Sequence, residues 1–253
     1  INTNWHAQGV WTEPGWRLDL QYQFIDQDQL RRGTHAVSPG EVARHHDEVR
    51  TINRNWVGTL DYAIDPKWGV SFTLPAMSRS HSHVHNHHEH DGSMSHETEE
   101  WSFSRVGDAR VVGRYQFMGD GMAPSAGVNF GLKLPTGSHK VDNGDGERAE
   151  RSLQPGTGTT DAIVGAWYRM PLVDGDSTLF LQAMAQIATD ERDGFKPGSQ
   201  FNVDVGWQRQ LAPAWAVFVQ ANFQLRGRDK GDEAEPEDSG SRKLFLSPGL
   251  SYA

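Results

Sequence analysis

The chain of 253 residues contains no cysteine, which excludes disulfide cross-links and thiolate metal sites. It also lacks any run approaching the roughly 18 apolar residues that a membrane-spanning helix needs, so a helical membrane protein is excluded. Positive charge is scarce: 33 Asp and Glu residues outnumber 24 Lys and Arg residues, and the formal net charge is −9. No nucleic-acid partner is expected, because such a partner would require a basic face.

A membrane β-barrel is still allowed, because only every second residue of each strand must face lipid. Apolar and polar residues do alternate; Phe130 and Leu132, for example, stand between Asn129, Gly131 and Lys133. Ten stretches show such alternation or a β-prone composition, most of them close to the roughly 9 to 11 residues with which a tilted strand crosses a bilayer. They are residues 16–24, 51–64, 70–74, 109–117, 126–134, 161–170, 179–187, 201–207, 215–225 and 244–252.

The connections alternate in length, as in outer-membrane barrels with short periplasmic turns and long external loops. The short connections lie near residues 65, 120, 173 and 213, and the long ones at residues 26–48, 78–100, 135–160, 189–199 and 226–242. Ser38 and Glu41 fit a capping box, which predicts a short helix ending at about His46. A soluble lipocalin-like barrel or sandwich is the alternative. Tryptophans near strand ends favour lipid-interface girdles instead; they are Trp16, Trp56, Trp68, Trp207 and Trp215.

Several short motifs occur in a characteristic order: LDYAID at 60–65 before Trp68, LP at 74–75, GDARVVGRYQ at 107–116, GLKLPTG at 131–137 and SLQPGTG at 152–158. In these motifs the chain resembles the outer-membrane β-barrel family labelled "putative MetA-pathway of phenol degradation", regarded as transporters. The resemblance spans about residues 15–253. It implies an all-β fold, an antiparallel transmembrane β-barrel in the outer membrane of a Gram-negative bacterium, with ten strands in this chain and twelve when complete.

We therefore expect one domain over residues 1–253, with an N-terminal periplasmic segment at residues 1–15 and a His-rich external loop at residues 78–100. If the apolar face meets lipid, the alternating polar residues line the lumen. A lining rich in Gln offers no apolar conduit, so the phenol label is not carried to any residue. The predicted lumen residues are Asp19, Gln21, Gln23, Asn53, Asn55, Arg110, Arg114, Gln116, Asn129, Lys133, Gln182, Gln186, Asp204, Gln220, Asn222 and Gln224.

The sharpest chemical signal is a run of histidines in the second long loop, because neutral imidazole binds zinc, copper and nickel. If the preceding strand continues, the alternate histidines share one face. The alternative is a solvated low-complexity segment that binds metal adventitiously. The candidate divalent-metal ligands are His81, His83, His85, His87, His88, His90 and His96.

Two external loops are acidic. Calcium is a weaker candidate ligand at residues 142–147, where the spacing does not complete a calcium loop. The acidic residues of 229–238 favour a solvated segment or one that faces lipopolysaccharide and is bridged to it by divalent cations. Adjacent His–Asp pairs, such as His46 with Asp47 and His90 with Asp91, keep a hydrolase at the rim as a minor alternative, although no nucleophile motif is present.

The sequence thus predicts a non-enzymatic channel or transport component, embedded in outer-membrane lipid and lipopolysaccharide, with a metal-binding rim. The alternative is a closed barrel that acts as a structural sleeve for an envelope protein partner in a larger envelope or electron-transfer assembly. Ion conductance separates these two hypotheses.

Overall fold

The computed structural model describes residues 14–38, 41, 46–88, 94–119, 123–142, 146, 148–237 and 239–252. The predicted N-terminal segment lies outside these residues except for its last two. Eleven strands form one antiparallel sheet, and a separate pair, β2 (Arg31–Arg32) and β3 (His35–Ala36), lies in the first long connection. The sheet strands are β1 (Gly15–Gln27), β4 (His46–Ala63), β5 (Trp68–His88), β6 (Met94–Val106), β7 (Ala109–Met118), β8 (Ser125–Leu134), β9 (Asp161–Pro171), β10 (Ser177–Ala188), β11 (Gln200–Ala212), β12 (Trp215–Arg226) and β13 (Ser241–Tyr252).

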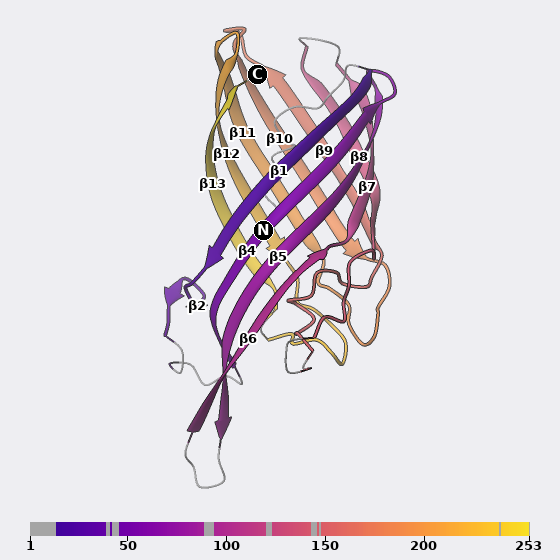
Figure 1. Cartoon of the computed structure of the whole chain (residues 1–253). Coiled ribbons are helices and arrows are strands. Elements are labelled where there is room, and N and C mark those ends of the chain that lie inside the picture. Colours follow the sequence, from indigo (N-terminus) through magenta and orange to yellow (C-terminus); the bar gives the residue numbers. More distant parts are fainter. Residues whose placement is uncertain are drawn as a thin grey trace.

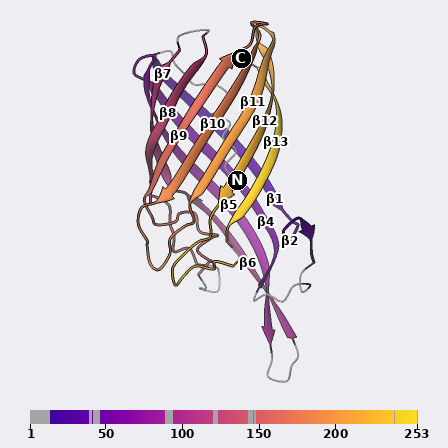
Figure 2. The ribbon, with the colours of Figure 1, turned by 180° about the vertical axis from the view of Figure 1, so that it is seen from behind.

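The strands curl into the wall of a barrel in the order β1-β4-β5-β7-β8-β9-β10-β11-β12-β13 (Figures 1 and 2). All pairs are antiparallel, and β1 and β13 are the edges of the sheet, unpaired with each other in the described part of the chain. Short turns join the strands at one end and long connections at the other (Figure 1). The predicted antiparallel barrel fold is confirmed, with the ten expected strands forming this path.

The interpretation of residues 78–100 as a loop is wrong. β5 continues through this region to His88 and pairs with β6 in register from Ala76 opposite Val106 to His88 opposite Met94. The hairpin projects past the other long connections (Figure 1). The outer half of β5 is polar on both faces, so apolar alternation does not reveal it, and β6 shows alternation only at the buried Trp101 and Phe103.

The predicted helix after Ser38 lies mostly outside the described residues. Ser38 N–H donates a hydrogen bond to the Glu41 carboxylate at 2.8 Å, which is one half of a capping box. His46 is not the end of a helix but the first residue of β4. Within the described ranges, no helix has the length and apolar character to span a membrane.

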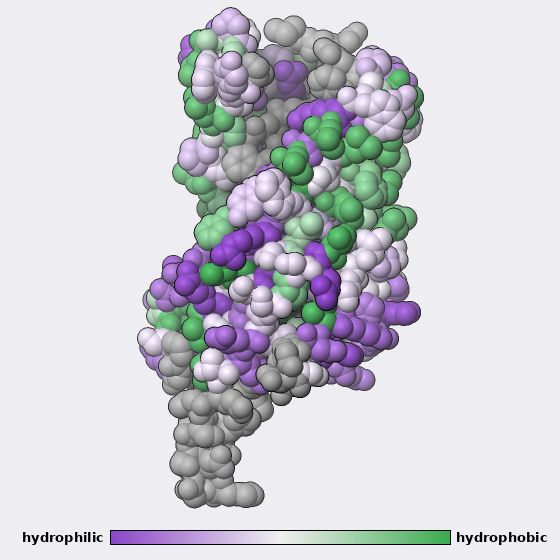
Figure 3. Space-filling model, viewed as in Figure 1, coloured by the Kyte–Doolittle hydropathy of each residue, from purple (hydrophilic) through white to green (hydrophobic). Residues whose placement is uncertain are grey.

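The outer face of the sheet is apolar. Leu18, Leu244 and Leu246 keep 74–76 % of their surface exposed, far more apolar exposure than a soluble barrel shows at successive outward positions. Figure 3 shows apolar residues over the strands and hydrophilic residues gathered toward the end with the long connections. The outward side chains therefore form a lipid-facing band.

Aromatic pairs mark the end with the short turns. Trp68 packs on Tyr115 with ring centroids 4.5 Å apart, and two further cross-strand pairs lie at the same level. Such amphipathic rings are typical of the membrane–water boundary. The other two pairs are Trp16 with Tyr62 and Trp215 with Tyr252. The expected tryptophans Trp56 and Trp207 lie further along their strands, opposite Tyr22 and Leu179.

Candidate functional site

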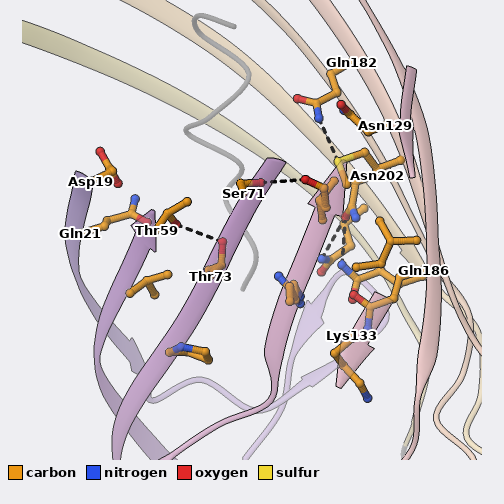
Figure 4. Close-up of a pocket in the computed structure, with 18 of the residues that line it drawn as sticks. Asp19, Gln21, Thr59, Ser71, Thr73, Asn129, Lys133, Gln182, Gln186 and Asn202 are labelled. Carbon is orange, nitrogen blue, oxygen red and sulfur yellow. Dashed lines mark hydrogen bonds between the residues drawn. The ribbon is translucent and has the colours of Figure 1, made fainter. Parts of the chain in front are cut away.

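The inner face of the sheet encloses a cavity of about 870 Å³. Its wall is built from alternate residues of almost every strand, since the strand period directs every second side chain inward. Figure 4 shows Asp19, Gln21 and Thr59 on one side of this space, across from Gln182 and Asn202. The lining is mostly amides, hydroxyls and guanidinium groups, which suits water and polar solutes.

Most of the predicted lumen residues lie on this cavity wall, and four do not. The side chains of Gln116, Asp204, Gln220 and Asn222 are buried but do not line the cavity. Gln116 donates a hydrogen bond to Gly119 O, and Asp204 accepts one from Asn222 at 2.6 Å, so both are engaged within the wall. Those at the cavity are Asp19, Gln21, Gln23, Asn53, Asn55, Arg110, Arg114, Asn129, Lys133, Gln182, Gln186 and Gln224.

Lys133 is the centre of a buried charge cluster near the end with the long connections. Its Nζ lies 2.9 Å from Asp161 and 3.3 Å from Asp108, and the lysine side chain is 4 % exposed. It also donates to Thr157 and Thr159. A lysine enclosed in this way is held charged by its two carboxylates, because an isolated ammonium would be too costly to bury.

Asp108 fixes the β8–β9 connection, residues 135–160, against the barrel wall. Its carboxylate accepts hydrogen bonds from the backbone N–H of Gly137 at 3.0 Å and of Thr157 at 2.9 Å. Arg79 on β5 donates to Leu153 O in the same connection. Since Pro155 and Thr157 line the cavity, the connection folds inward and narrows this end of the lumen.

Asp108 lies in one of the sequence motifs and Asp161 begins a predicted strand, but neither was predicted to face the lumen, and Arg79 was not predicted as a site residue. Arg79 stands in a stretch without apolar alternation, so no pattern assigned it a face. One feature of the sequence could have indicated these residues. Charged residues recur at the ends of strands next to a Gly/Pro-rich connection. Charges placed there face either the lumen or the solvent, and periodicity does not separate the two.

The cavity wall is richer in basic than in acidic side chains, with eight Lys and Arg against three Asp. Some of the basic residues are paired, as Lys133 is with Asp108 and Arg226 is with Asp229. In the portion of the chain that the structure places, no ion pair forms at Arg169 or Lys243, whereas Asp61 and Asp65 act electrostatically on Arg114. These cations give the lumen an excess positive charge within a chain of net charge −9.

The lumen is not uniformly polar, which corrects the expectation of a lining without an apolar conduit. Trp167 and Phe180 line the cavity with Ile163 and Met184. The ring of Trp167 lies over Gly127 of the neighbouring strand, where a Cβ would overlap it, and Phe180 lies over Gly206 in the same manner. Glycine on the adjacent strand thus provides the space for an inward aromatic ring. The sequence pattern within one strand does not reveal this contact, because the two residues belong to different strands.

Three long connections interlock into a cap, defined here as the described residues of 135–160, 189–199 and 227–240. Arg151 donates to Thr157 O and to Arg192 O, and its guanidinium lies 4.9 Å from the ring centre of the buried Phe195. Asp193 contacts Lys140 at 3.0 Å and His139 at 2.9 Å. Hydrogen bonds from Lys140 and His139 lower the pKa of the Asp193 carboxyl from 3.8 to about 2.

In the acidic loop at residues 229–238, one residue does not face solvent as expected. Asp229 is buried and paired with Arg226 at 2.9 Å, so it does not face lipopolysaccharide. In the calcium candidate, Asp142 forms an ion pair with Arg148 at 3.0 Å, while residues 143–145 and 147 lie outside the described residues.

Two of the seven candidate metal ligands are described with their side chains, and the structure brings them together. His81 and His83 lie on the inward face of β5, each only 2 % exposed, with His81 Nε2 3.0 Å from His83 Nδ1. Among the residues that the structure describes, no group of three or more His, Asp or Glu side chains is arranged to hold a metal ion. The side chains of His85, His87, His88, His90 and His96 lie outside the described part.

Comparisons with known proteins agree with this architecture. The model of the family described as "Putative MetA-pathway of phenol degradation" matches residues 51–253. The crystal structure of the COG4313 outer membrane channel from Pseudomonas putida F1 matches with a TM-score of 0.68 at 14 % sequence identity, over 98 % of this chain and 85 % of that chain. A search of curated proteins finds no match.

Proposed function

Because this chain belongs to the family described as "Putative MetA-pathway of phenol degradation" and has the fold of an outer-membrane barrel, we propose that it is a channel for small polar solutes, with a preference for anions. It lies in the bacterial outer membrane, where its apolar outer face and aromatic end pairs meet lipid. The likeness to an outer membrane channel from Pseudomonas putida F1 supports a transport role.

The observation that carries the anion preference is the excess of eight Lys and Arg over three Asp on the cavity wall, which includes Arg169 and Lys243, without an ion pair among the described residues. A narrow, low-dielectric wall with charge of one sign concentrates counter-ions and repels ions of the same sign. Rings of Arg and Lys are the usual means by which a pore selects anions.

Planar-bilayer recording tests this proposal. We expect steady single-channel conductance and a reversal potential in asymmetric KCl that indicates chloride as the more permeant ion. The double variant Arg114→Gln/Arg169→Gln should shift the reversal potential toward cations, whereas Arg148→Gln in the cap should change it little. An absence of conductance would reject the channel and leave a closed barrel, and an unchanged reversal potential in the double variant would reject the anion preference.

The second part of the proposal is that the His-rich hairpin binds divalent transition metal at the external rim. Its support is the continuation of β5 to His88 and the approach of His81 Nε2 to His83 Nδ1 at 3.0 Å on that strand. Zinc titration of the full chain, with and without His-to-Ser replacement at residues 81–90, tests this part separately from conductance.

A further inference from the structure

An oxygen atom lies close to each end of the pair of inward histidines on β5. Thr51 Oγ1 on β4 lies 2.8 Å from His81 Nδ1, and Glu99 Oε2 on β6 lies 3.3 Å from His83 Nε2. The remaining nitrogens, His81 Nε2 and His83 Nδ1, approach each other to 3.0 Å. Three strands thus contribute to one line of contacts, with the two inner nitrogens at its centre.

The positions of the ring protons on His81 and His83 can be worked out from the carboxylate of Glu99. Glu99 favours a proton on His83 Nε2, because an ionised carboxylate attracts a donor and repels a lone pair. A neutral His83 then accepts at Nδ1, His81 donates from Nε2, and Thr51 donates its hydroxyl to His81 Nδ1. When both rings are neutral, a single proton therefore lies between the two inner nitrogens, bonded to His81 Nε2 and donated to His83 Nδ1.

The inner nitrogens have the separation that a metal chelate requires. Bonds of about 2.0–2.1 Å place two imidazole nitrogens about 3.3 Å apart around a tetrahedral ion and about 2.9 Å apart at adjacent corners of a square-planar one. The observed 3.0 Å lies between these values. Moving the His81 proton from Nε2 to Nδ1 frees both inner lone pairs without changing the charge of either ring.

We propose that His81 Nε2 and His83 Nδ1 chelate one divalent transition metal ion of the zinc, copper or nickel class, with Thr51 and Glu99 as positioning residues. After the tautomer change, His81 Nδ1–H donates to the Thr51 hydroxyl, and His83 Nε2–H faces the Glu99 carboxylate. Outer partners of this kind fix the orientation of a ligating ring and raise its basicity. Water completes the coordination shell. The inference rests on the proposed metal binding of the hairpin and identifies its primary site.

The test uses the full-length protein in detergent, stripped of metal by a chelator, with zinc and copper as probes. Calorimetric titration gives affinity and stoichiometry, and electron paramagnetic resonance of the copper form reports the number of coordinated nitrogens. The pair variant is His81→Gln/His83→Gln, and the tip variant, which changes the histidines later in the run, is His87→Ser/His88→Ser/His90→Ser. Thr51→Val tests the positioning residue. Ser82→Ala on the opposite face of the strand is the matched control. Heat-dependent gel mobility confirms that each barrel is folded.

We expect the pair variant to lose the tightest site and the copper signal of two nitrogens, while the tip and Ser82→Ala variants keep both. Thr51→Val should retain the two-nitrogen signal but bind about tenfold more weakly, in line with the loss of an outer partner. If the pair variant binds as the parent does and the tip variant does not, this inference is overturned while metal binding by the hairpin stands. If the parent binds no metal, both are overturned, and the channel proposal is unaffected.

Discussion

At the scale of single residues, the stability of the barrel interior depends on a few buried charges that are paired with groups of opposite charge. Lys133 is the clearest case, because two carboxylates and two hydroxyls surround its ammonium group. The sequence identified Lys133 as inward-facing from its position opposite Leu132 and Leu134. It did not identify Asp161 and Asp108 as partners, because these approach from a neighbouring strand and from the residue before β7.

Replacing Lys133 with Met should destabilise the barrel by about 3–5 kcal/mol, because removal of one partner leaves buried carboxylates uncompensated. The matched control is Lys140→Met in the cap, whose ion pair with Asp193 is half exposed and screened by solvent, so its loss should change the stability little. Urea unfolding of both variants in detergent, followed by tryptophan fluorescence, measures the difference. Equal stability of the two variants would show that Lys133 is not held as described.

Asp193 allows a test of the cap by pH. Its pKa is lowered from 3.8 to about 2 by hydrogen bonds from Lys140 and His139. A lowered pKa means that the carboxylate contacts are fully present above pH 3.8 and are lost as the pH falls through about 2. Carbon-13 NMR titration of the carboxyl groups should show an aspartate with a midpoint near pH 2, and Asp193→Asn should abolish that signal. A midpoint near 3.8 for every aspartate would contradict the ion pairs in the cap.

At the scale of elements, the strands inside the membrane could be predicted and those beyond it could not. Alternation identifies β8 and β12 because lipid on one side and polar lumen on the other impose a period of two. The outer half of β5 has polar residues on both faces, and β6 has only Trp101 and Phe103 as buried apolar residues among its described side chains, so alternation gave too short a signal to predict their pairing. The same reason explains why the cap had no predicted structure: its order comes from side chains such as Arg151 and Gln154, which hydrogen-bond backbone groups of distant loop residues.

The aromatic–glycine contacts between neighbouring strands are also testable. A Cβ at Gly206 would overlap the ring of Phe180, so Gly206→Ala should push the ring toward the cavity, destabilise the barrel by about 1–3 kcal/mol and lower the conductance. Gly58→Ala is the control, because the nearest atom to its Cβ is Leu74 O at 4.0 Å. Restoration of conductance in Gly206→Ala/Phe180→Ala would confirm that the ring is the cause. Equal behaviour of the two single variants would argue that Phe180 does not lie over Gly206.

At the scale of the whole molecule, the sequence predicted the fold and the location of most lumen residues but not the balance of charge inside. The net charge of the lumen depends on which carboxylates form ion pairs. Ion pairs such as that of Lys133 with Asp161 are made between residues of different strands, so the pattern within one strand does not predict them. Lys243, for instance, reads from sequence as one of several charges near a strand start. The structure places it on the cavity wall with no acidic partner among the described residues.

The proposed anion preference should weaken with salt, because it arises from charges acting over the width of the lumen. Between about 0.1 M and about 1 M salt the screening length falls from about 10 Å to about 3 Å. The ratio of chloride to potassium permeability should therefore approach unity over this range, as measured by reversal potentials at a fixed ratio of concentrations. A ratio independent of salt would assign selectivity to direct contact at one narrow site instead.

The cap and the lumen carry opposite charge at different heights along the same axis. The exposed residues Asp232, Glu235 and Glu237 belong to a long connection, whereas Arg114 and Arg169 lie toward the short turns. An ion that enters from one side meets the negative layer first, and one that enters from the other side meets the positive layer first. This separation of charge along the axis predicts that the channel passes more current at one polarity of the membrane voltage than at the other.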